Sequence, residues 1–252
     1  MSSSANTTTL PLPRANIPAP ACVISLLQRL HAASIAQETD PAFVSHAAQV
    51  ATLSAEQRTS PDFVAKNKTL MQDKFIALER EKCEALYVLL RALGATTVIE
   101  AGTSFGVSTI YLALAANQNA ATRASRDSAR VIATEHEATK AEKARSHWKE
   151  AGPDIESTIE LREGDILETL AKDLPPQIDF VLLDIWAPLA YPTLELLLPH
   201  LRVGAVVATD NTLTHSEGYS KLLGLLRAPD GPFRSTTLPY APGGLEISVY
   251  LP

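Results

Sequence analysis

The chain has 252 residues, of which 46% are hydrophobic, and a formal net charge of -6 at pH 7. A chain of this length can bury one substantial core, so we expect a single domain with an N-terminal extension. The acidic balance and the absence of a basic run argue against a nucleic-acid partner, because phosphate binding needs a basic face, and small molecules are the expected partners.

Residues 1–18 are rich in Ser, Thr, Pro and Asn, lack an apolar signal core, and are expected to form a disordered tail. Residues 19–59 carry apolar side chains such as Val23 and Leu26 at helical spacing, which predicts an extension of short helices. These helices would cap an active site, pair with a second copy of the chain in a homodimer, or cover a sheet edge. Two cysteines are too few for a disulfide framework, so we expect a reducing, cytoplasmic setting. The sequence has no apolar run of about 18 residues, so no membrane span is expected.

Residues 60–252 are expected to form the main domain, which begins with a helix signal. Ser60 can cap a helix and Pro61 suits its first position. Apolar side chains then follow at steps of three and four residues as far as Leu93, and Gly94 ends the pattern. The spacing predicts one long helix from Pro61 to Leu93 that leads into the first strand.

The run TVIEAGTSFGVSTIYLA, residues 97–113, has the clearest physical meaning in the chain. Val98 and Ile99 predict a buried strand, and Gly102 and Gly106 turn the chain into an apolar helix. The polar side chains of the turn lie near the positive N-terminal end of that helix, where they favour a bound ligand. The residues predicted to contact the ligand through this turn are Glu100, Gly102, Thr103, Ser104, Gly106 and Ser108.

The glycine spacing distinguishes between two ligands that use such a strand, turn and helix. A dinucleotide fingerprint needs glycine two and five residues after Gly102, where this chain has Ser104 and Val107. The carboxylate of Glu100 would also repel a pyrophosphate, whereas it suits the ammonium and sulfonium of S-adenosylmethionine (SAM). The pattern therefore favours SAM, and the alternative is a tight turn in an unrelated α/β protein.

Two further strand ends carry residues suited to a nucleoside. VIATE, residues 131–135, predicts a second strand, and its terminal Glu135 would accept hydrogen bonds from the ribose hydroxyls. Alternatively, Glu135 faces solvent and caps the next helix. A third strand over 159–162 is followed by Asp165, which would accept from the adenine amine while Ile166 packs on the ring. The other residues assigned to this part of the cofactor are His136 and Gly164.

The rest of the chain completes an α/β sheet. Strands predicted over 178–184 and 205–211 are apolar, as buried parallel strands are, and end in Asp184 and in the pair Asp210-Asn211. The carboxyl ends of such strands bind ligands in α/β folds. Two last strands form a hairpin-like ending that breaks the alternation. We therefore predict a Rossmann-like, doubly wound sheet of seven strands in the order 3-2-1-4-5-7-6, with the last strand antiparallel.

These motifs resemble a known family over roughly residues 60–252. VIEAGTSFGVSTIYLA and ATDNTL are the specific ones, and ATEHE, REGD and FVLLD add to them. Together they resemble the class I SAM-dependent methyltransferases, and among these the small O-methyltransferases related to catechol and caffeoyl-CoA O-methyltransferases (family 3). The resemblance implies a Rossmann-like fold, SAM as cofactor, and methyl transfer to a hydroxyl of a small, aromatic, catechol-like acceptor.

The resemblance also implies a metal site. In cation-dependent members of that family, one aspartate after the fourth strand and an Asp-Asn pair after the fifth hold a divalent ion, and Asp184, Asp210 and Asn211 stand at those positions. Three oxygen ligands with waters suit Mg²⁺, which would chelate vicinal hydroxyls and lower the pKa of the one to be methylated. The alternative is that Asp184 orients SAM or the acceptor and that no metal binds.

One position departs from the family pattern Asp-x-x-Lys, in which the lysine helps to deprotonate the acceptor. Here the run is DIWA, residues 184–187, so Ala187 stands where the lysine is expected. His215 is the better placed substitute base and His136 is the other candidate. The predicted catalytic residues are Asp184 and His215.

Two aromatic residues follow the fourth strand. Trp186, which is also assigned to the cofactor site, and Tyr191 would stack on an aromatic acceptor or lie at the rim of the site. The missing lysine leaves a second function open, namely a SAM-binding protein that has lost methyl transfer and serves another catalytic or partner role. A nucleic-acid N-methyltransferase is disfavoured, because DIWA does not match the Asn or Asp followed by Pro-Pro and an aromatic residue that those enzymes share.

Overall fold

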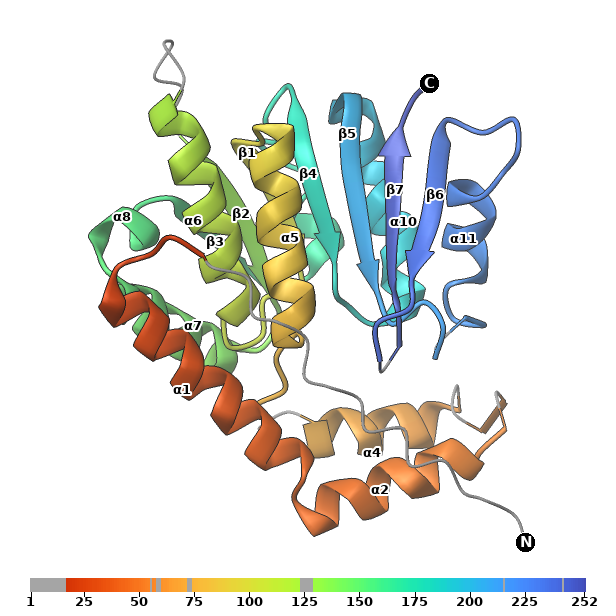
Figure 1. Ribbon diagram of the computed structural model, residues 1–252. Coiled ribbons are helices and arrows are strands. Elements are labelled where there is room, and N and C mark those ends of the chain that lie inside the picture. Colours follow the sequence, from red (N-terminus) through yellow and green to blue (C-terminus); the bar gives the residue numbers. More distant parts are fainter. Residues whose placement is uncertain are drawn as a thin grey trace, which may run out of the picture.

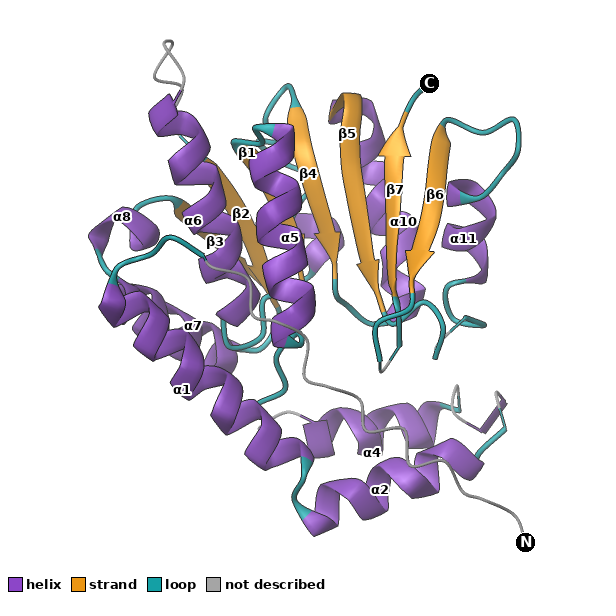
Figure 2. Cartoon of the chain, in the orientation of Figure 1, coloured by secondary structure: helices purple, strands orange, loops and turns teal. Residues whose placement is uncertain are grey.

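The computed structural model describes residues 17–54, 56–57, 60–71, 74–122, 129–214, 216–241 and 243–252. Its centre is a seven-stranded sheet in the order β3-β2-β1-β4-β5-β7-β6 (Figures 1 and 2). The strands are β1 Thr97–Ala101, β2 Arg130–Glu135, β3 Ile159–Glu163, β4 Ile178–Leu183, β5 Leu201–Asp210, β6 Phe233–Leu238 and β7 Leu245–Tyr250. Neighbours among β1 to β5 are parallel, and β7 runs antiparallel to β5 and β6. The predicted strand order and the antiparallel last strand are confirmed.

Helices cover both faces of the sheet (Figure 2). The helices of the described residues are α1 Ala21–Glu38, α2 Pro41–Thr52, α4 Pro61–Met71, α5 Arg80–Leu93, α6 Val107–Thr122, α7 Ala138–Ala151, α8 Pro153–Glu156, α9 Ile166–Thr169, α10 Ala187–Leu197 and α11 Ser220–Leu226, with a 3₁₀ turn at Leu198–His200. One core joins the sheet to α1, α5, α6 and α7, and a second core joins it to α10 and α11. Val98 belongs to the first core and Ile99 to the second, because side chains alternate along a strand.

The N-terminal helices occupy two places on the domain. α1 packs against α6 and α7 and buries Leu26. α2 and α4 lie beyond the carboxyl ends of β4 and β5 (Figure 1), and His46 Nε2 of α2 lies 3.0 Å from Asn67 Oδ1 of α4. Ile17, which the sequence places in the N-terminal tail, is buried in the first core. Residues 1–16 of that tail lie outside the described residues.

The prediction of a single long helix from Pro61 to Leu93 is wrong in the middle of that segment. Residues 74–79 lie between α4 and α5 and are not helical. The ring of Phe75 meets the ring of Phe105 edge-on, with centroids 4.5 Å apart, and the Ala77 amide donates to Ser34 Oγ at 2.9 Å. These contacts with the turn after β1 and with α1 outweigh the helical periodicity of the segment, because helix propensity is a weak preference that tertiary packing overrides.

The amino end of the sheet is fastened by Asp179, the second residue of β4. Its Oδ2 accepts hydrogen bonds from the backbone amides of Thr96 at 2.8 Å and Thr97 at 2.9 Å, and its Oδ1 accepts from Arg202 Nε at 2.5 Å. Burial raises the pKa of this carboxyl, but the two amides and the guanidinium outweigh burial and leave the pKa below its usual value. One carboxylate thereby joins β1, β4 and β5.

Replacing Asp179 with Asn should lower the free energy of unfolding by about 1–3 kcal/mol at neutral pH, because a buried charged acceptor is lost. The carboxyl has a lower pKa in the folded than in the unfolded chain. Its contribution is therefore complete above the unfolded pKa of about 4 and disappears as the pH falls through the folded value. Urea titrations of both chains at several pH values measure this. The stability difference should shrink on the acid side, and a difference that does not depend on pH would contradict the assignment.

Candidate active site

The order of the strands brings the predicted site residues to one edge of the sheet. β3, β2, β1, β4 and β5 are neighbours, so their carboxyl ends form a row. Main-chain hydrogen bonds join the loops that follow them, from Gly164 N to Glu135 O at 2.9 Å and from Asp184 N to Ala101 O at 2.9 Å. The turn after β1 lies in the middle of this row, between the ends of β2 and β4.

Glu100, in β1, has no exposed surface, and hydroxyl groups of the following turn and helix hold its carboxylate. Oε2 accepts from Thr103 Oγ1 at 2.7 Å and from Thr109 Oγ1 at 2.5 Å. Oε1 accepts from Ser108 Oγ at 2.6 Å. Burial raises the pKa of Glu100 above its usual value, although the three hydroxyls act against the rise. The carboxylate fixes β1 to the start of α6, and its contact with a ligand stays a prediction.

Gly102 and Gly106 allow two close contacts within the protein. Their φ angles are +91° and +78°, which favour glycine. A Cβ on Gly102 would lie 2.0 Å from the carbonyl oxygen of Asp184, and a Cβ on Gly106 would lie 2.4 Å from Trp148 Nε1. A side chain at either position would push the end of β4 or α7 away from the turn. Packing alone requires both glycines, and their predicted contact with a ligand stays a prediction.

Several backbone amides of the turn donate within the protein. Thr103 N donates to Thr134 O at 2.9 Å, and Ser104 N donates to Glu135 Oε2 at 2.8 Å. Gly106 N donates to Thr103 O at 2.8 Å. The pyrophosphate of a dinucleotide would need such amides for its own oxygens. These three amides are therefore not available to a pyrophosphate, in agreement with the glycine spacing.

Glu135, at the end of β2, is half-buried and its carboxylate is held in a fixed orientation. Oε2 accepts from Ser104 N and Oε1 accepts from Glu137 N, each at 2.8 Å. Each oxygen keeps a further lone pair for another donor. The bond to Ser104 sets the carboxylate beside the turn, so Glu135 is more than a solvent-facing cap of α7. Its contact with a ribose stays a prediction.

The remaining residues predicted to contact the cofactor surround these carboxylates. Asp165 is exposed and caps α9 by accepting from Leu167 N at 2.8 Å, whereas Ile166 is buried in the second core. His136 is exposed beyond the end of β2, and Trp186, at the N-cap of α10, is 59% exposed. All four follow the carboxyl ends of strands, as predicted, and their contacts with a cofactor stay predictions.

Asp184, directly after β4, is surrounded by other acidic groups. Burial raises its pKa well above the usual value. The nearby carboxylates of Asp210, Glu100 and Glu79 raise it further, because like charges disfavour ionisation. The ammonium of Lys82 acts in the opposite direction. Four carboxyl groups and one ammonium share this end of the sheet, and a cationic ligand would favour the ionised form of the carboxyls whose pKa values are raised.

Lys82, in the first turn of α5, contacts two of these carboxylates, those of Asp210 and Glu79. The motifs of the sequence do not single out this lysine. Its Nζ lies 2.6 Å from Asp210 Oδ1 and 2.8 Å from Glu79 Oε2. Burial lowers the pKa of Lys82, but the bonds to the two carboxylates outweigh burial and raise it, so the side chain is an ammonium ion. One sequence signal could have identified it. Lys82 lies four residues after Leu78 and four before Leu86, on a stripe of buried apolar side chains.

The residues predicted to bind a divalent ion do not fit one. Asp210 Oδ1 is paired with the Lys82 ammonium, and Asp210 Oδ2 accepts from Asn211 Nδ2 at 2.7 Å. Two like unit charges about 4 Å apart repel by about 4 kcal/mol in protein surroundings, and a divalent ion doubles this.

The predicted bases are only partly placed. His215 lies outside the described residues, so its role stays a prediction. Ala187, at the position of the missing lysine, is the first residue of α10. Tyr219, which the sequence patterns do not indicate, is buried close by and donates from its hydroxyl to Ile185 O at 3.2 Å. Burial and the nearby carboxylates of Asp184 and Asp210 raise the pKa of this phenol, so the hydroxyl keeps its proton.

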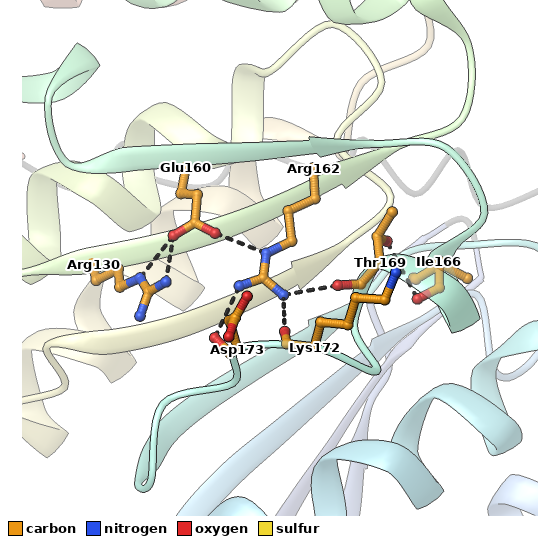
Figure 3. Close-up of polar contacts among 7 residues, drawn as sticks. All are labelled: Arg130, Glu160, Arg162, Ile166, Thr169, Lys172 and Asp173. Carbon is orange, nitrogen blue, oxygen red and sulfur yellow. Dashed lines mark hydrogen bonds and ion pairs between the residues drawn. The ribbon is translucent and has the colours of Figure 1, made fainter.

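A separate cluster of charged side chains lines a surface pocket at the β3 edge. Figure 3 shows the polar contacts within this cluster. Glu160 accepts from Arg130 Nε and Nη2 at 2.8 and 2.5 Å and from Arg162 Nε at 2.8 Å. Arg162 also donates to three carbonyl oxygens in and after α9, at 2.7, 2.8 and 3.0 Å. These charges pair with one another and bind β3 to the segment after it, so the cluster serves the fold.

Comparisons with known proteins agree with this geometry. Residues 99–212 match a family model described as "Methyltransferase domain". The chain is similar to the solved structure of an O-methyltransferase from Bacillus cereus in complex with SAH, at 19% identity and a TM-score of 0.63, with 94% of this chain and 93% of that chain covered. A search of curated proteins found no match.

Two further solved structures share the architecture. One is the O-methyltransferase TomG from Streptomyces achromogenes, involved in tomaymycin synthesis and in complex with SAM, at 20% identity and a TM-score of 0.61, with 90% of this chain and 99% of that chain covered. The other is the SAH-bound methyltransferase PaMTH1 from Podospora anserina, at 13% identity and a TM-score of 0.62, with 92% of this chain and 89% of that chain covered.

At identities this low, the structural similarity establishes the fold alone. The chain has the fold of the class I SAM-dependent methyltransferases, and O-methyltransferases are among its structural neighbours, as the sequence resemblance implies. Among the helices that the structure describes, none is both long enough and apolar enough to cross a membrane.

Replacing Glu100 with Gln should lower the free energy of unfolding by about 1–3 kcal/mol, because the amide turns a donor towards buried hydroxyl donors. Glu100→Ala should cost more, since all three hydroxyls lose their acceptor. Glu150→Gln is the control. Its carboxylate pairs with Arg29 on the surface, where both side chains are more than half exposed, and its loss should cost less than about 1 kcal/mol. Urea denaturation measures all three, and equal losses for Glu100→Gln and Glu150→Gln would contradict the assignment.

Proposed function

We propose that the chain is a SAM-dependent O-methyltransferase that methylates a hydroxyl group of a small, aromatic, catechol-like molecule. The observation that carries the proposal is the row of carboxylates at the carboxyl edge of a methyltransferase fold. Glu135 stands on one side of the turn fixed by Glu100, and Asp184 stands on the other.

The charge of the site supports SAM as the cofactor. SAM has a positive sulfonium and a positive ammonium, and the excess of carboxyl groups around Asp184 would neutralise them. Glu135 would accept from the ribose hydroxyls through the lone pairs that its amide partners leave, while Asp165 and Ile166 would take the adenine. When bound, SAM supplies an activated methyl group and keeps the carbon–sulfur bonding pair on sulfur.

Asp184 is the proposed base for the acceptor. The acceptor oxygen forms the new bond to carbon, the O–H bond breaks, and the proton passes to the Asp184 carboxylate. Asp184 is held in place for this role because its backbone amide donates to Ala101 O and its carbonyl packs on Gly102. Positioning of this kind supplies much of the rate in a displacement between two bound groups. His215 stays a second proposed base.

Aromatic side chains near the end of β4 support an aromatic acceptor. Trp186 is largely exposed there, and Tyr191 is half-buried one turn further along α10, so both could stack on a ring. α2 and α4 lie beyond the same edge of the sheet (Figure 1), where they would cover the acceptor. Both Cys22 and Cys83 are free thiols, which suits the proposed cytoplasmic setting. A homodimer stays part of the proposal.

A second function is favoured by one observation. Ala187 stands where the resembled family has its lysine, and a chain without that base could bind SAM without transferring the methyl group. This chain would then serve another catalytic or partner role. Binding measurements and turnover measurements separate the two functions.

Incubation with SAM and a panel of catechols and phenols should produce SAH, measured by chromatography. Asp184→Asn should lower kcat by about 10²–10⁴-fold, the usual loss for a general base. Glu135→Gln should raise the KM for SAM by about tenfold, because one charge-assisted acceptor of the ribose is lost. Glu150→Gln, on the exposed end of α7, should change neither.

Two results would count against the proposal in different ways. SAH binding without turnover on any member of the panel would favour the second function. A chain that is folded by circular dichroism but binds neither SAM nor SAH would overturn both functions.

A further inference from the structure

Lys82 places a positive charge inside the carboxyl edge of the sheet. The residue has 0% exposed surface, and lysine is almost never fully buried unless it is paired. Its Nζ lies 2.6 Å from Asp210 Oδ1 and 2.8 Å from Glu79 Oε2. Asp210 is itself only 3% exposed, so this ion pair is shielded from solvent and from salt.

The Lys82–Asp210 pair lies where the family pattern would place a divalent ion. Asn211 Nδ2 donates to the second oxygen of Asp210 at 2.7 Å. Asn211 also has a φ of 61°, and its Oδ1 packs against Gly243, where an added Cβ would lie 2.1 Å from that oxygen. A divalent ion needs oxygen lone pairs. Asp210 instead meets an ammonium on one side and an amide N–H on the other.

We propose that the Lys82 ammonium replaces the divalent ion, so that it neutralises Asp210 and keeps divalent cations out of the site. Lys82 is a positioning residue that acts through Asp210, because it has no exposed surface with which to touch an acceptor. It also links α5 to the end of β5, beside the end of β4 that carries Asp184.

The consequence for catalysis rests on the proposed function. Methyl transfer by this chain needs no divalent cation, since the charge that such an ion would bring to Asp210 is already present as an ammonium. Chelation is what demands two vicinal hydroxyls on the acceptor. A site without a chelated ion therefore also accepts aromatic molecules with a single hydroxyl, which widens the acceptor class beyond catechols.

The test is a titration of the full chain with Mn²⁺ alone. The electron paramagnetic resonance signal of the free ion measures how much Mn²⁺ stays unbound. The wild-type chain and the control Lys172→Met, at the distant β3 edge, should leave the signal of free Mn²⁺ unchanged. Lys82→Met removes the ammonium and keeps the apolar stem, so Asp210 should become available. Its Kd for Mn²⁺ should be at least about tenfold lower than that of the wild type. The double variant Lys82→Met/Asp210→Asn should lose this binding again.

The wild-type chain decides the matter even if Lys82→Met does not fold. Stoichiometric Mn²⁺ binding by the wild type that is lost in Asp210→Asn would overturn the proposal. A folded Lys82→Met chain that binds Mn²⁺ no better than the wild type would also overturn it. Failure of the proposed function is recognised separately, by calorimetry with SAH, because the Mn²⁺ titration requires no turnover. Where turnover is found, equal rates with EDTA and with added Mg²⁺ support the proposal, and loss of turnover in EDTA contradicts it.

Discussion

The site depends on the buried carboxylate of Glu100. A charged group without exposed surface is tolerated only when hydrogen bonds replace its water, and here three hydroxyls do so. They come from the turn and from the start of α6, so the end of β1 and the helix move as one unit. Gly102 and Gly106 then let β4 and α7 close on the turn. This packing fixes Asp184 on one side of the turn and leaves Glu135 on the other.

Charge is the second constraint on the same edge. The carboxyl groups of Glu79, Glu100, Asp184 and Asp210 lie close enough to shift one another's ionisation. Lys82 compensates part of this repulsion inside the folded chain, and the remainder suits a ligand with a sulfonium and an ammonium. A cationic cofactor would favour the ionised form of these carboxyls, whose pKa values are raised in the free chain. A divalent ion would compete with the Lys82 ammonium for the Asp210 carboxylate.

Much of the fold could be predicted because its signals are local. β4 is buried on both faces, and its continuous apolar sequence indicates this directly. The position of Glu135 beside the turn follows from the strand order. The break before α5 could not be predicted, because Phe75 leaves the helical pattern to meet Phe105, which is distant in sequence. Periodicity shows Lys82 on a buried stripe, but only the folded chain shows that Asp210 is its partner. Likewise, the carbonyl that requires Gly102 belongs to Asp184, directly after β4 and much later in the chain.

The most direct measurement is a crystal structure of the chain with SAH at saturating concentration. We predict electron density for the nucleoside at the ends of β2 and β3, with the ribose hydroxyls on Glu135, and for the amino-acid end between the Gly102 turn and Asp184. Glu100 should keep its three hydroxyl partners in that complex. SAH bound at another surface, or a ribose that makes no contact with Glu135, would contradict the assignment of the turn as the cofactor site.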